Sequence, residues 1–467
     1  RKEKAKGGEI DDVQYTGYVS TSSIASKLDM LSSQKFRELY PQYDKGSNVD
    51  WLDEISRTPI THVHNLSMRG GNSKTNYAAN LNYNSQEGIM LKSDNKTFRG
   101  RIEVNHRMFD DKLLVKFSVL GRENKFTSTS DAGSFNGGAY WQALRRNPTD
   151  PIYNADGTYY QNKDKLDYLN PIALLNEADG NVKTSEVRYS STLTYNPIKD
   201  LTLNALFSYV KENRATGYSE TLQHSSATVY GFPGYSAISG FNRMEKQTEL
   251  TAKYDKTIDK NKFSVLGGYS YIESDIERSN MSNYGFQDDY FGGWHNIGAG
   301  SALPLGLANM GSSKNHSNLI SFFGRMTYAY DDKYLFMASL RHEGASQLYG
   351  TNNAWGTFPA VSIGWKITNE NFMKNQTLFD EIKLRAGYGV TGSQPANSFL
   401  GVALLQYGDF ALVNGQWVRT ITPASNPNPD LRWEEKKETN IGVDFAMFSG
   451  RLSGSIDAYN RNVDGLL

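Results

Sequence analysis

The chain has 467 residues, with 50 basic and 50 acidic side chains and a formal net charge of zero. That balance excludes the basic excess of a nucleic-acid-binding protein, so we expect no nucleic-acid partner. The chain has no cysteine, which excludes disulfides and thiolate metal sites.

The chain opens with four charged residues, 1–4, and leads into glycines, with no apolar stretch behind them that would indicate a signal peptide. The sequence therefore predicts either a cytoplasmic protein or a mature or trimmed chain. No apolar run approaches the roughly 20 residues that a membrane-spanning helix needs. A membrane barrel would also look polar on average, because its strands alternate apolar and polar residues.

Apolar and polar residues alternate with period two in many segments, among them 201–209, 320–330, 382–390 and 451–460. Successive side chains of a strand point to opposite faces, so each segment is predicted to be a strand with one apolar and one polar face. We expect the apolar set to face lipid and the polar set to face the lumen of a barrel or the plug within it. The lipid-facing examples are Leu203, Phe207, Leu384 and Leu452, and the lumen-facing ones are Asn204, Lys383, Arg385 and Asp457.

The connections alternate between short and long. The short ones are rich in Asp, Asn, Gly and Pro, which turn a chain tightly, and lie near 71–74, 109–112, 197–200, 259–262, 331–333 and 449–451, with a longer member at 369–381. The long ones are 21–61, 122–186, 213–244, 274–317, 342–357 and 391–435. Short turns at one end and long loops at the other are typical of an outer-membrane barrel. About fifteen strands of about ten residues favour this over a soluble sandwich, whose strands are usually shorter.

Aromatic residues gather in two kinds of place. Tyr195, Tyr330, Tyr334 and Phe445 flank short turns on the apolar faces and predict an interfacial girdle, although ordinary packing is the alternative. The long loops carry aromatic and acidic residues that suit sugar rings or peptide side chains, or that pack the loops together. The candidate substrate-binding residues are Tyr140, Trp141, Asp288, Asp289, Tyr290, Phe291 and Trp294.

Signatures of catalysis and metal binding are weak. Residues 387–392 match G-x-G-x-x-G, but a loop rather than a helix is expected after them, so a nucleotide site is not predicted. His62 and His64 share a strand face, and a polar lumen or rim pair is favoured over a metal site. No spacing resembles a hydrolase signature. We expect no catalytic residue, no metal and no cofactor.

Several stretches resemble the SusC/RagA-like TonB-dependent outer-membrane transporters, and they cover almost the whole chain in the family's order. They include 50–54 (DWLDE), 64–89 (HNLSMRGGNSKTNYAANLNYNSQEGI), 382–394 (IKLRAGYGVTGSQ) and 428–467, which begins NPDLRWEEKKETNIGVDF. The resemblance implies that residues 1–12 are the end of a plug or linker and that 13–467 are part of the barrel. Such barrels have about 22 strands, so the C-terminal ones are expected to lie beyond this sequence.

The resemblance also implies a function. Members import oligosaccharides or oligopeptides across the outer membrane, with a SusD-like surface lipoprotein as lid and the TonB complex acting on the plug. A dimer of transporter–lipoprotein pairs is compatible with it, and outer-membrane lipid is an expected partner. An oligopeptide importer of the RagA kind is the alternative to glycan import. The competing classes are a soluble all-β carbohydrate-binding protein or enzyme, and a passive porin.

Overall fold

The computed structural model describes residues 12–127, 138–162, 165, 168–225, 231–289 and 293–465. The helices are short: α1 (Ser33–Leu39), α2 (Trp51–Glu54), α3 (Ala139–Arg145) and α4 (Pro171–Asn176), with 3-10 turns η1 (Pro41–Tyr43), η2 (Gly293–Ala299), η3 (Ser346–Leu348), η4 (Ile367–Asn369) and η5 (Asn371–Met373). None of the helices in the described parts of the chain is long and apolar enough to cross a bilayer.

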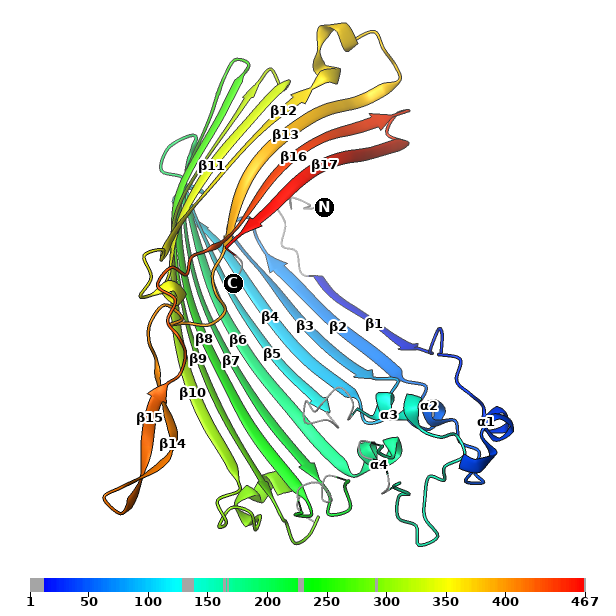
Figure 1. Ribbon diagram of the computed structural model, residues 1–467. Helices are drawn as coiled ribbons and strands as arrows, with labels where there is room; N and C mark the ends of the chain where they lie inside the picture. Colours follow the sequence, from blue (N-terminus) through cyan, green and yellow to red (C-terminus); the bar gives the residue numbers. More distant parts are fainter. Residues whose placement is uncertain are drawn as a thin grey trace.

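The strands are β1 (Asp12–Thr21), β2 (Ile60–Gly71), β3 (Thr75–Glu87), β4 (Asp94–Met108), β5 (Leu113–Thr127), β6 (Ala178–Tyr195), β7 (Leu201–Glu220), β8 (Tyr235–Ile258), β9 (Asn261–Tyr284), β10 (Asn309–Tyr330), β11 (Tyr334–Ala345), β12 (Trp355–Lys366), β13 (Phe379–Ser393), β14 (Leu405–Val413), β15 (Gln416–Pro423), β16 (Glu434–Met447) and β17 (Leu452–Asp464). Fifteen of these strands form one antiparallel sheet in the described residues. Each pairs with the next along the chain, except that β13 pairs with β16 because the hairpin β14–β15 is inserted between them. Figure 1 shows the sheet as a strongly curved wall, which confirms the predicted all-β class and antiparallel barrel.

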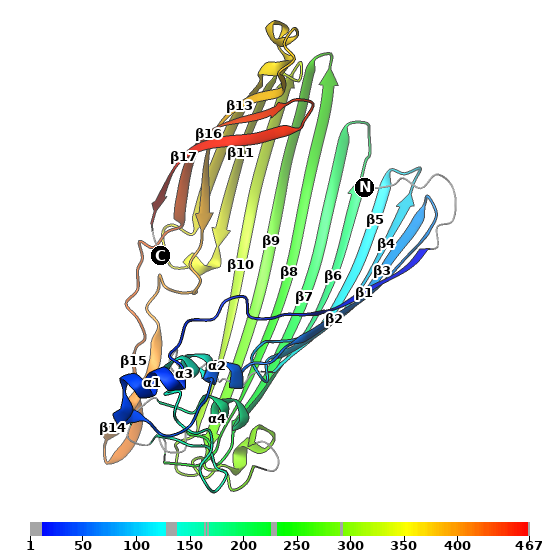
Figure 2. The ribbon, with the colours of Figure 1, turned by 90° about the vertical axis from the view of Figure 1, so that its right-hand side faces the viewer.

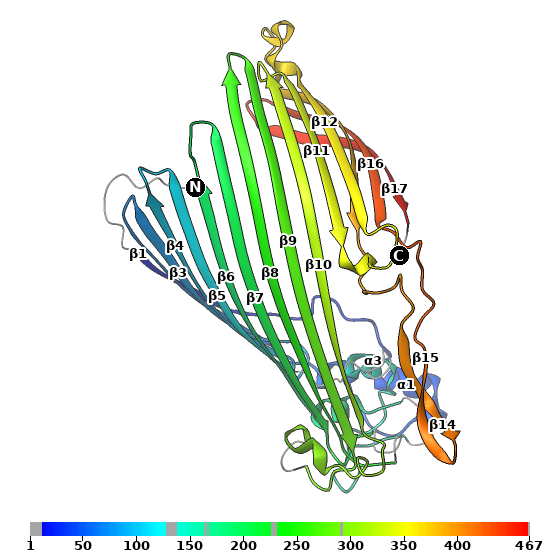
Figure 3. The same cartoon turned by 90° about the vertical axis from the view of Figure 1, so that its left-hand side faces the viewer.

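The two ends of the wall differ, as the alternation of short and long connections predicts. The short turns lie at one end, where aspartates adopt the left-handed conformation: φ is 70° at Asp200, 50° at Asp259 and 53° at Asp331. Aspartate tolerates this conformation better than most side chains, so it suits these connections of two to five residues. The helices α1 to α4 gather at the opposite end (Figure 2), and the β14–β15 hairpin extends at that same end (Figure 3).

The register joins the alternating strands into two continuous faces. Leu384 pairs with Val443, which pairs with Ile456, so apolar side chains form a belt across β13, β16 and β17. Lys383 pairs with Asp444 on the opposite face. The residues predicted to face lipid all lie on the apolar face and are exposed by 36–49%: Leu203, Phe207, Leu384 and Leu452. The predicted assignment of residues to the two faces is therefore confirmed.

Two predicted loops are wrong in extent. Residues 213–244 belong mostly to strands, because β7 continues to Glu220 and β8 begins at Tyr235. Residues 274–317 are strand at both ends, because β9 continues to Tyr284 and β10 begins at Asn309. β8 and β9 reach 24 residues each, well beyond the predicted ten. Beyond the apolar belt the apolar and polar alternation fades, although the backbone pairing continues.

Buried side chains gather at the loop end rather than inside the sheet. One cluster joins the loop between β1 and β2 to the loop between β5 and β6, and a second surrounds Leu348, Phe358 and Trp433. Among the described residues no second layer covers the curved sheet, so its large apolar side chains are exposed on the convex face. The first cluster therefore lies within the loops, whereas the second joins loop residues to Phe358 of β12 and Val390 of β13.

Candidate functional site: the lumenal wall and the loop cap

The concave face of the wall is lined with polar side chains that bond to one another across strands. The Asn82 amide donates to Asn65 at 2.7 Å, and the Asn80 amide donates to the Ser67 hydroxyl at 2.6 Å. Such cross-strand pairs hold the side chains in place without needing water. This face is suited to contact with a polar ligand or with another protein domain.

Charged residues on this face are arranged in pairs and networks. The Arg385 guanidinium lies 3.1 Å from an Asp444 oxygen and 2.7 Å from an Asp457 oxygen. Arg385 also donates to the Asn440 side chain at 3.1 Å. A guanidinium presents several donors in a fixed plane, so it can join three strands at once. The predicted lumenal residues Arg385 and Asp457 thus brace β13, β16 and β17.

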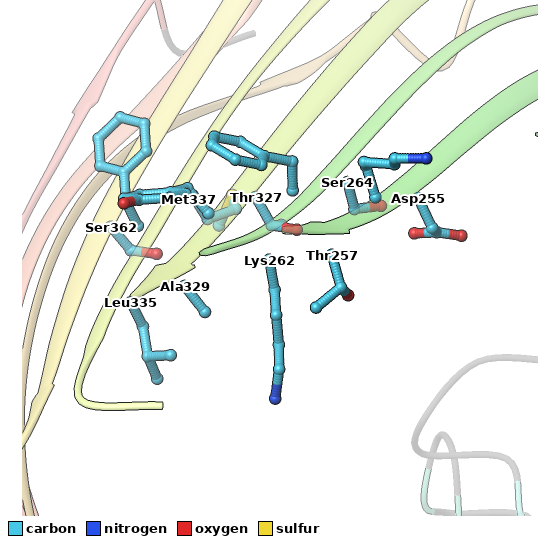
Figure 4. Close-up of a pocket in the computed structure, with 13 residues that line it drawn as sticks. Asp255, Thr257, Lys262, Ser264, Thr327, Ala329, Leu335, Met337 and Ser362 are labelled. Atoms are coloured by element: carbon cyan, nitrogen blue, oxygen red, sulfur yellow. The ribbon is translucent and has the colours of Figure 1, made fainter. Parts of the chain in front are cut away.

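A hollow of about 410 Å³ lies on the concave face near the short turns. Figure 4 shows its side chains gathered on the inner side of the curved sheet. It is lined from β8 to β12 by residues that include Asp255, Thr257, Lys262, Thr327 and Ser362. An open, mixed polar hollow of this kind offers hydrogen bonds but no enclosed reaction chamber.

The loop end is closed partly by what we call the loop cap, the described parts of residues 22–59 and 138–177. Asp50 begins α2 by accepting hydrogen bonds from the backbone N–H groups of Leu52 and Asp53 at 3.1 Å. Trp51 then donates to the Asn147 carbonyl at 2.9 Å. The apolar core of the cap consists of Trp51, Leu52, Ile55, Ala139, Ala143, Ile172, Leu174 and Leu175.

An ion pair inside the loop cap is almost completely buried. Arg146 lies 3.1 Å from Asp150, and their side chains are exposed by only 0% and 2%. The guanidinium also stacks over the rings of Tyr168 at 4.6 Å, Trp51 at 5.4 Å and Tyr160 at 5.6 Å. Cation–π contacts of this kind offset part of the cost of removing a charge from water.

Burial shifts the titration of this cluster. Loss of water lowers the pKa of Arg146 and raises the pKa of Asp150, while each charge partly offsets the shift of the other. Burial also raises the pKa of Tyr168 to about 12. The Tyr168 hydroxyl donates to Asp150 at 3.1 Å and accepts from the Asn147 backbone N–H at 2.6 Å. These contacts join residues 146–150 to Tyr168 within the loop between β5 and β6.

A groove of about 970 Å³ runs along the loop cap. Its walls include Leu28, Met30, Phe36 and Tyr43 from the loop after β1, and Lys165 from the loop after β5. Leu28 is 60% exposed and Tyr43 is 58% exposed, so the apolar lining is open to solvent. Sequence reasoning did not select these residues, because irregular backbone gives no periodic signal.

The predicted substrate-binding residues that the structure describes lie at three separate places. Tyr140, 50% exposed, and Trp141 lie on α3 in the loop cap. Asp288 and Asp289 line a separate polar hollow of about 490 Å³, and Asp289 accepts from the Leu222 backbone N–H at 3.0 Å. Tyr290 and Phe291 lie outside the described residues.

Trp294 occupies a third position. Its indole lies against Gly217, where a Cβ atom would come within 2.8 Å of it. Gly217 is on the same face as Phe207, the apolar convex face, so this tryptophan packs on the outer side of the wall. Contact with substrate stays a prediction for all seven residues, and the position of Trp294 favours a packing role.

Histidine side chains approach other possible metal ligands at two places on the convex face. Glu273, Asp275 and His316 hold ligand atoms within 4.8 Å of one another, with no ion present, and His316 is hydrogen-bonded to Asp275 at 2.8 Å. His62 Nδ1 lies 3.2 Å from His64 Nε2, at the rim rather than in the lumen. Mutual hydrogen bonds account for both arrangements, so neither requires a metal.

The fold and its two faces define part of a β-barrel wall with a polar lumen and structured loops at one end. The chain matches the TonB dependent receptor-like β-barrel family over residues 117–467 and belongs to that family. Its relatives are outer-membrane receptors and transporters rather than enzymes, in agreement with the non-catalytic expectation.

Individual relatives confirm the resemblance to SusC and RagA. The chain is 27% identical over 99% of its length to the TonB-dependent receptor SusC of Bacteroides thetaiotaomicron, covering 48% of that protein. It is 29% identical over 96% of its length to the TonB-dependent receptor P3 of Formosa agariphila, covering 45% of it. The chain thus spans about half the length of the curated relatives it matches.

Solved structures agree on the fold. The RagAB peptide transporter superposes with a TM-score of 0.81 at 20% identity, over 98% of this chain and 55% of that one. The copper transporter OprC superposes with a TM-score of 0.54 at 12% identity, over 99% of this chain and 55% of that one. At these identities the likeness shows the architecture and leaves the substrate open.

Proposed function

We propose that the protein imports an oligomeric nutrient across the outer membrane, driven by TonB, with a SusD-like surface lipoprotein as its lid. The observation that carries this proposal is the pairing of a polar lumenal wall with an ordered loop cap at one end of it. A passive pore needs the first feature but not the second. The family membership of the chain supports the dependence on TonB.

The proposed location is the outer membrane, with the apolar convex belt in contact with lipid. Exposed side chains such as Ile102, Phe117 and Phe263 would otherwise remain in water, at about 25 cal/mol per Å² of apolar surface. Tyr330 and Tyr334 stack at 6.4 Å beside a short turn, where an interfacial girdle is expected. Both observations support an orientation with short turns in the periplasm and the loop cap outside the cell.

The lipoprotein is proposed to rest on the loop cap, and the groove lined by Leu28, Met30 and Tyr43 offers apolar area for that contact. The TonB complex would act through a plug that the family carries, of which residues 1–12 would be the end or the linker. A dimer of transporter–lipoprotein pairs is compatible with this arrangement.

The proposed substrate class is an oligosaccharide, with an oligopeptide as the second candidate. Aromatic side chains beside carboxylates and amides suit both, because each kind of ligand combines apolar faces with hydrogen-bonding groups. The sequence similarity to SusC supports the first candidate, and the fold of the RagAB peptide transporter supports the second.

The import experiment uses the full-length protein with its lipoprotein, expressed in cells that lack their own copy. Labelled glycan and peptide oligomers should enter the periplasm chemically unchanged, and uptake should stop when TonB is deleted. Uptake that persists without TonB and without the lipoprotein would indicate a passive pore. Cleaved products that vanish on mutation of one residue of this chain would indicate an enzyme.

The role of the loop residues is tested in the same cells. Truncating the side chains of Tyr140 and Trp141 to alanine should weaken oligomer binding by about ten-fold or more, as expected for aromatic anchors. Tyr349, 65% exposed after β11, is the matched control for an exposed loop aromatic. Equal losses for Y140A and Y349A, or no loss for either, would exclude a specific contact at α3.

A further inference from the structure

Three lysines stand side by side on the convex face of the wall, close to its loop end. Lys96 of β4 pairs directly with Lys125 of β5, and Lys125 pairs directly with Lys183 of β6. All three side chains are exposed. They share their face with Ile102 and Val119, the apolar belt proposed to contact lipid.

This arrangement is electrostatically unfavourable within the chain itself. Directly opposite residues of an antiparallel pair have Cβ atoms about 5 Å apart, and like charges there repel. Glu123 approaches only one member of the row, at 3.9 Å from Lys183. Lys96 and Lys125 form no ion pair with any residue that the structure describes.

Other lysines of the convex face are neutralised by their neighbours. Lys246 lies 3.0 Å from Glu273, and Lys314 lies 2.8 Å from Glu277. The sheet therefore supplies close carboxylates for lysines on β8 and β10, whereas in the row on β4 to β6 it supplies one carboxylate, Glu123, at 3.9 Å from Lys183. An anion from outside the chain would relieve the repulsion.

The depth of the row indicates which anion. Phe98 and Met108 lie ten residues apart on β4, with Met108 at the short turn. About 9–11 residues of a tilted strand cross the hydrocarbon of a bilayer. Lys96 is the next convex-face residue beyond Phe98, so the row stands where the hydrocarbon ends and the headgroups of the outer leaflet begin.

We propose that Lys96, Lys125 and Lys183 bind the phosphate groups of a phosphorylated glycolipid in the outer leaflet, whose acyl chains lie along the apolar belt beside them. The proposal rests on the outer-membrane location given under the proposed function and adds a lipid site to it. Lysine suits this role because its ammonium is a compact charge on a flexible stem and can follow a mobile headgroup.

The continuity of the row with the apolar belt favours lipid over a protein partner. A glycolipid places phosphates and acyl chains in the same vertical order as the lysines and Ile102, Val119 and Tyr189 on the strands below them. An acidic protein surface would complement the lysines, but it would not cover the apolar belt below them.

The experiment uses the purified full-length transporter in detergent, with native mass spectrometry as the readout. The probes are diphosphoryl lipid A and the same lipid with its phosphates removed. The wild type should retain the phosphorylated lipid preferentially, and added salt should weaken that retention. The triple variant K96Q/K125Q/K183Q should weaken it by about ten-fold or more.

The matched control is K74Q/K112Q/K374Q, three exposed lysines near the short turns, which should retain lipid like the wild type. Folding of each variant is verified by its heat-dependent migration in gels. Equal retention of both lipids, or unchanged retention by the first triple variant, would overturn the proposal. Loss of the co-purifying lipoprotein with lipid retention intact would show a protein interface instead. This experiment measures lipid retention without any transport substrate. A negative result would therefore overturn the lipid site and would not bear on the proposed import.

Discussion

Arg146 is the residue on which the order of the loop cap depends most. Its removal leaves Asp150 buried without its cation, so R146A should destabilise the cap by about 3–5 kcal/mol. Limited proteolysis of the loops in the folded transporter measures this, because cleavage follows local opening. The double variant R146M/D150N removes both charges, so it should destabilise the loop cap less than R146A does. Equal cleavage of R146A and the wild type would contradict the argument.

Tyr168 provides a pH dependence at the same scale. Burial raises its pKa to about 12, above the ordinary value of 10.0, so the folded cap binds the phenolic proton more tightly than the unfolded loop does. The stabilisation is therefore fully present below about pH 10 and is lost as the pH rises towards 12. The phenolate absorbance of the wild type and of Y168F is measured as the pH is raised. The difference between the two curves should show a tyrosine with a pKa of about 12. A difference titration centred near 10 would show that Tyr168 is solvated.

At the scale of elements, the short turns decide where each strand reverses. Asp259 adopts a φ of 50° between β8 and β9, a conformation that costs a β-branched residue about 1–2 kcal/mol. D259V should therefore lower the free energy of unfolding by that amount, whereas D259G should leave it unchanged or higher. Denaturant unfolding in micelles compares the two. If both variants lose stability equally, the side chain rather than the backbone is responsible.

At the scale of the whole molecule, the two faces of the wall must meet different solvents. Phe207 lies on the convex face of β7 and is 47% exposed in this chain, while the adjacent Ser208 faces the lumen. An arginine in place of Phe207 should cost about 2–4 kcal/mol near the middle of the bilayer. S208R, one position away, should cost much less. Unfolding from lipid vesicles measures the difference, and equal costs would reverse the assigned faces.

The sequence by itself determined the faces and the short turns. Side-chain alternation follows from the strand period alone, so Leu384 and Arg385 can be assigned to opposite sides without knowing their neighbours. Aspartates at positions such as 200 and 331 mark the turns because few side chains accept a positive φ. Both signals are local, and the structure confirms both.

Tertiary structure decided everything that depends on pairing over long distances in the chain. The true ends of β8 and β9 follow from the partners that continue beyond the apolar belt, where no alternation marks them. The lysine row exists only because the register brings Lys96, Lys125 and Lys183 side by side. Likewise, the loop cap depends on Trp51 meeting Arg146 from another loop. Propensity and periodicity act over a few residues, whereas these contacts are selected by the packing of the complete wall.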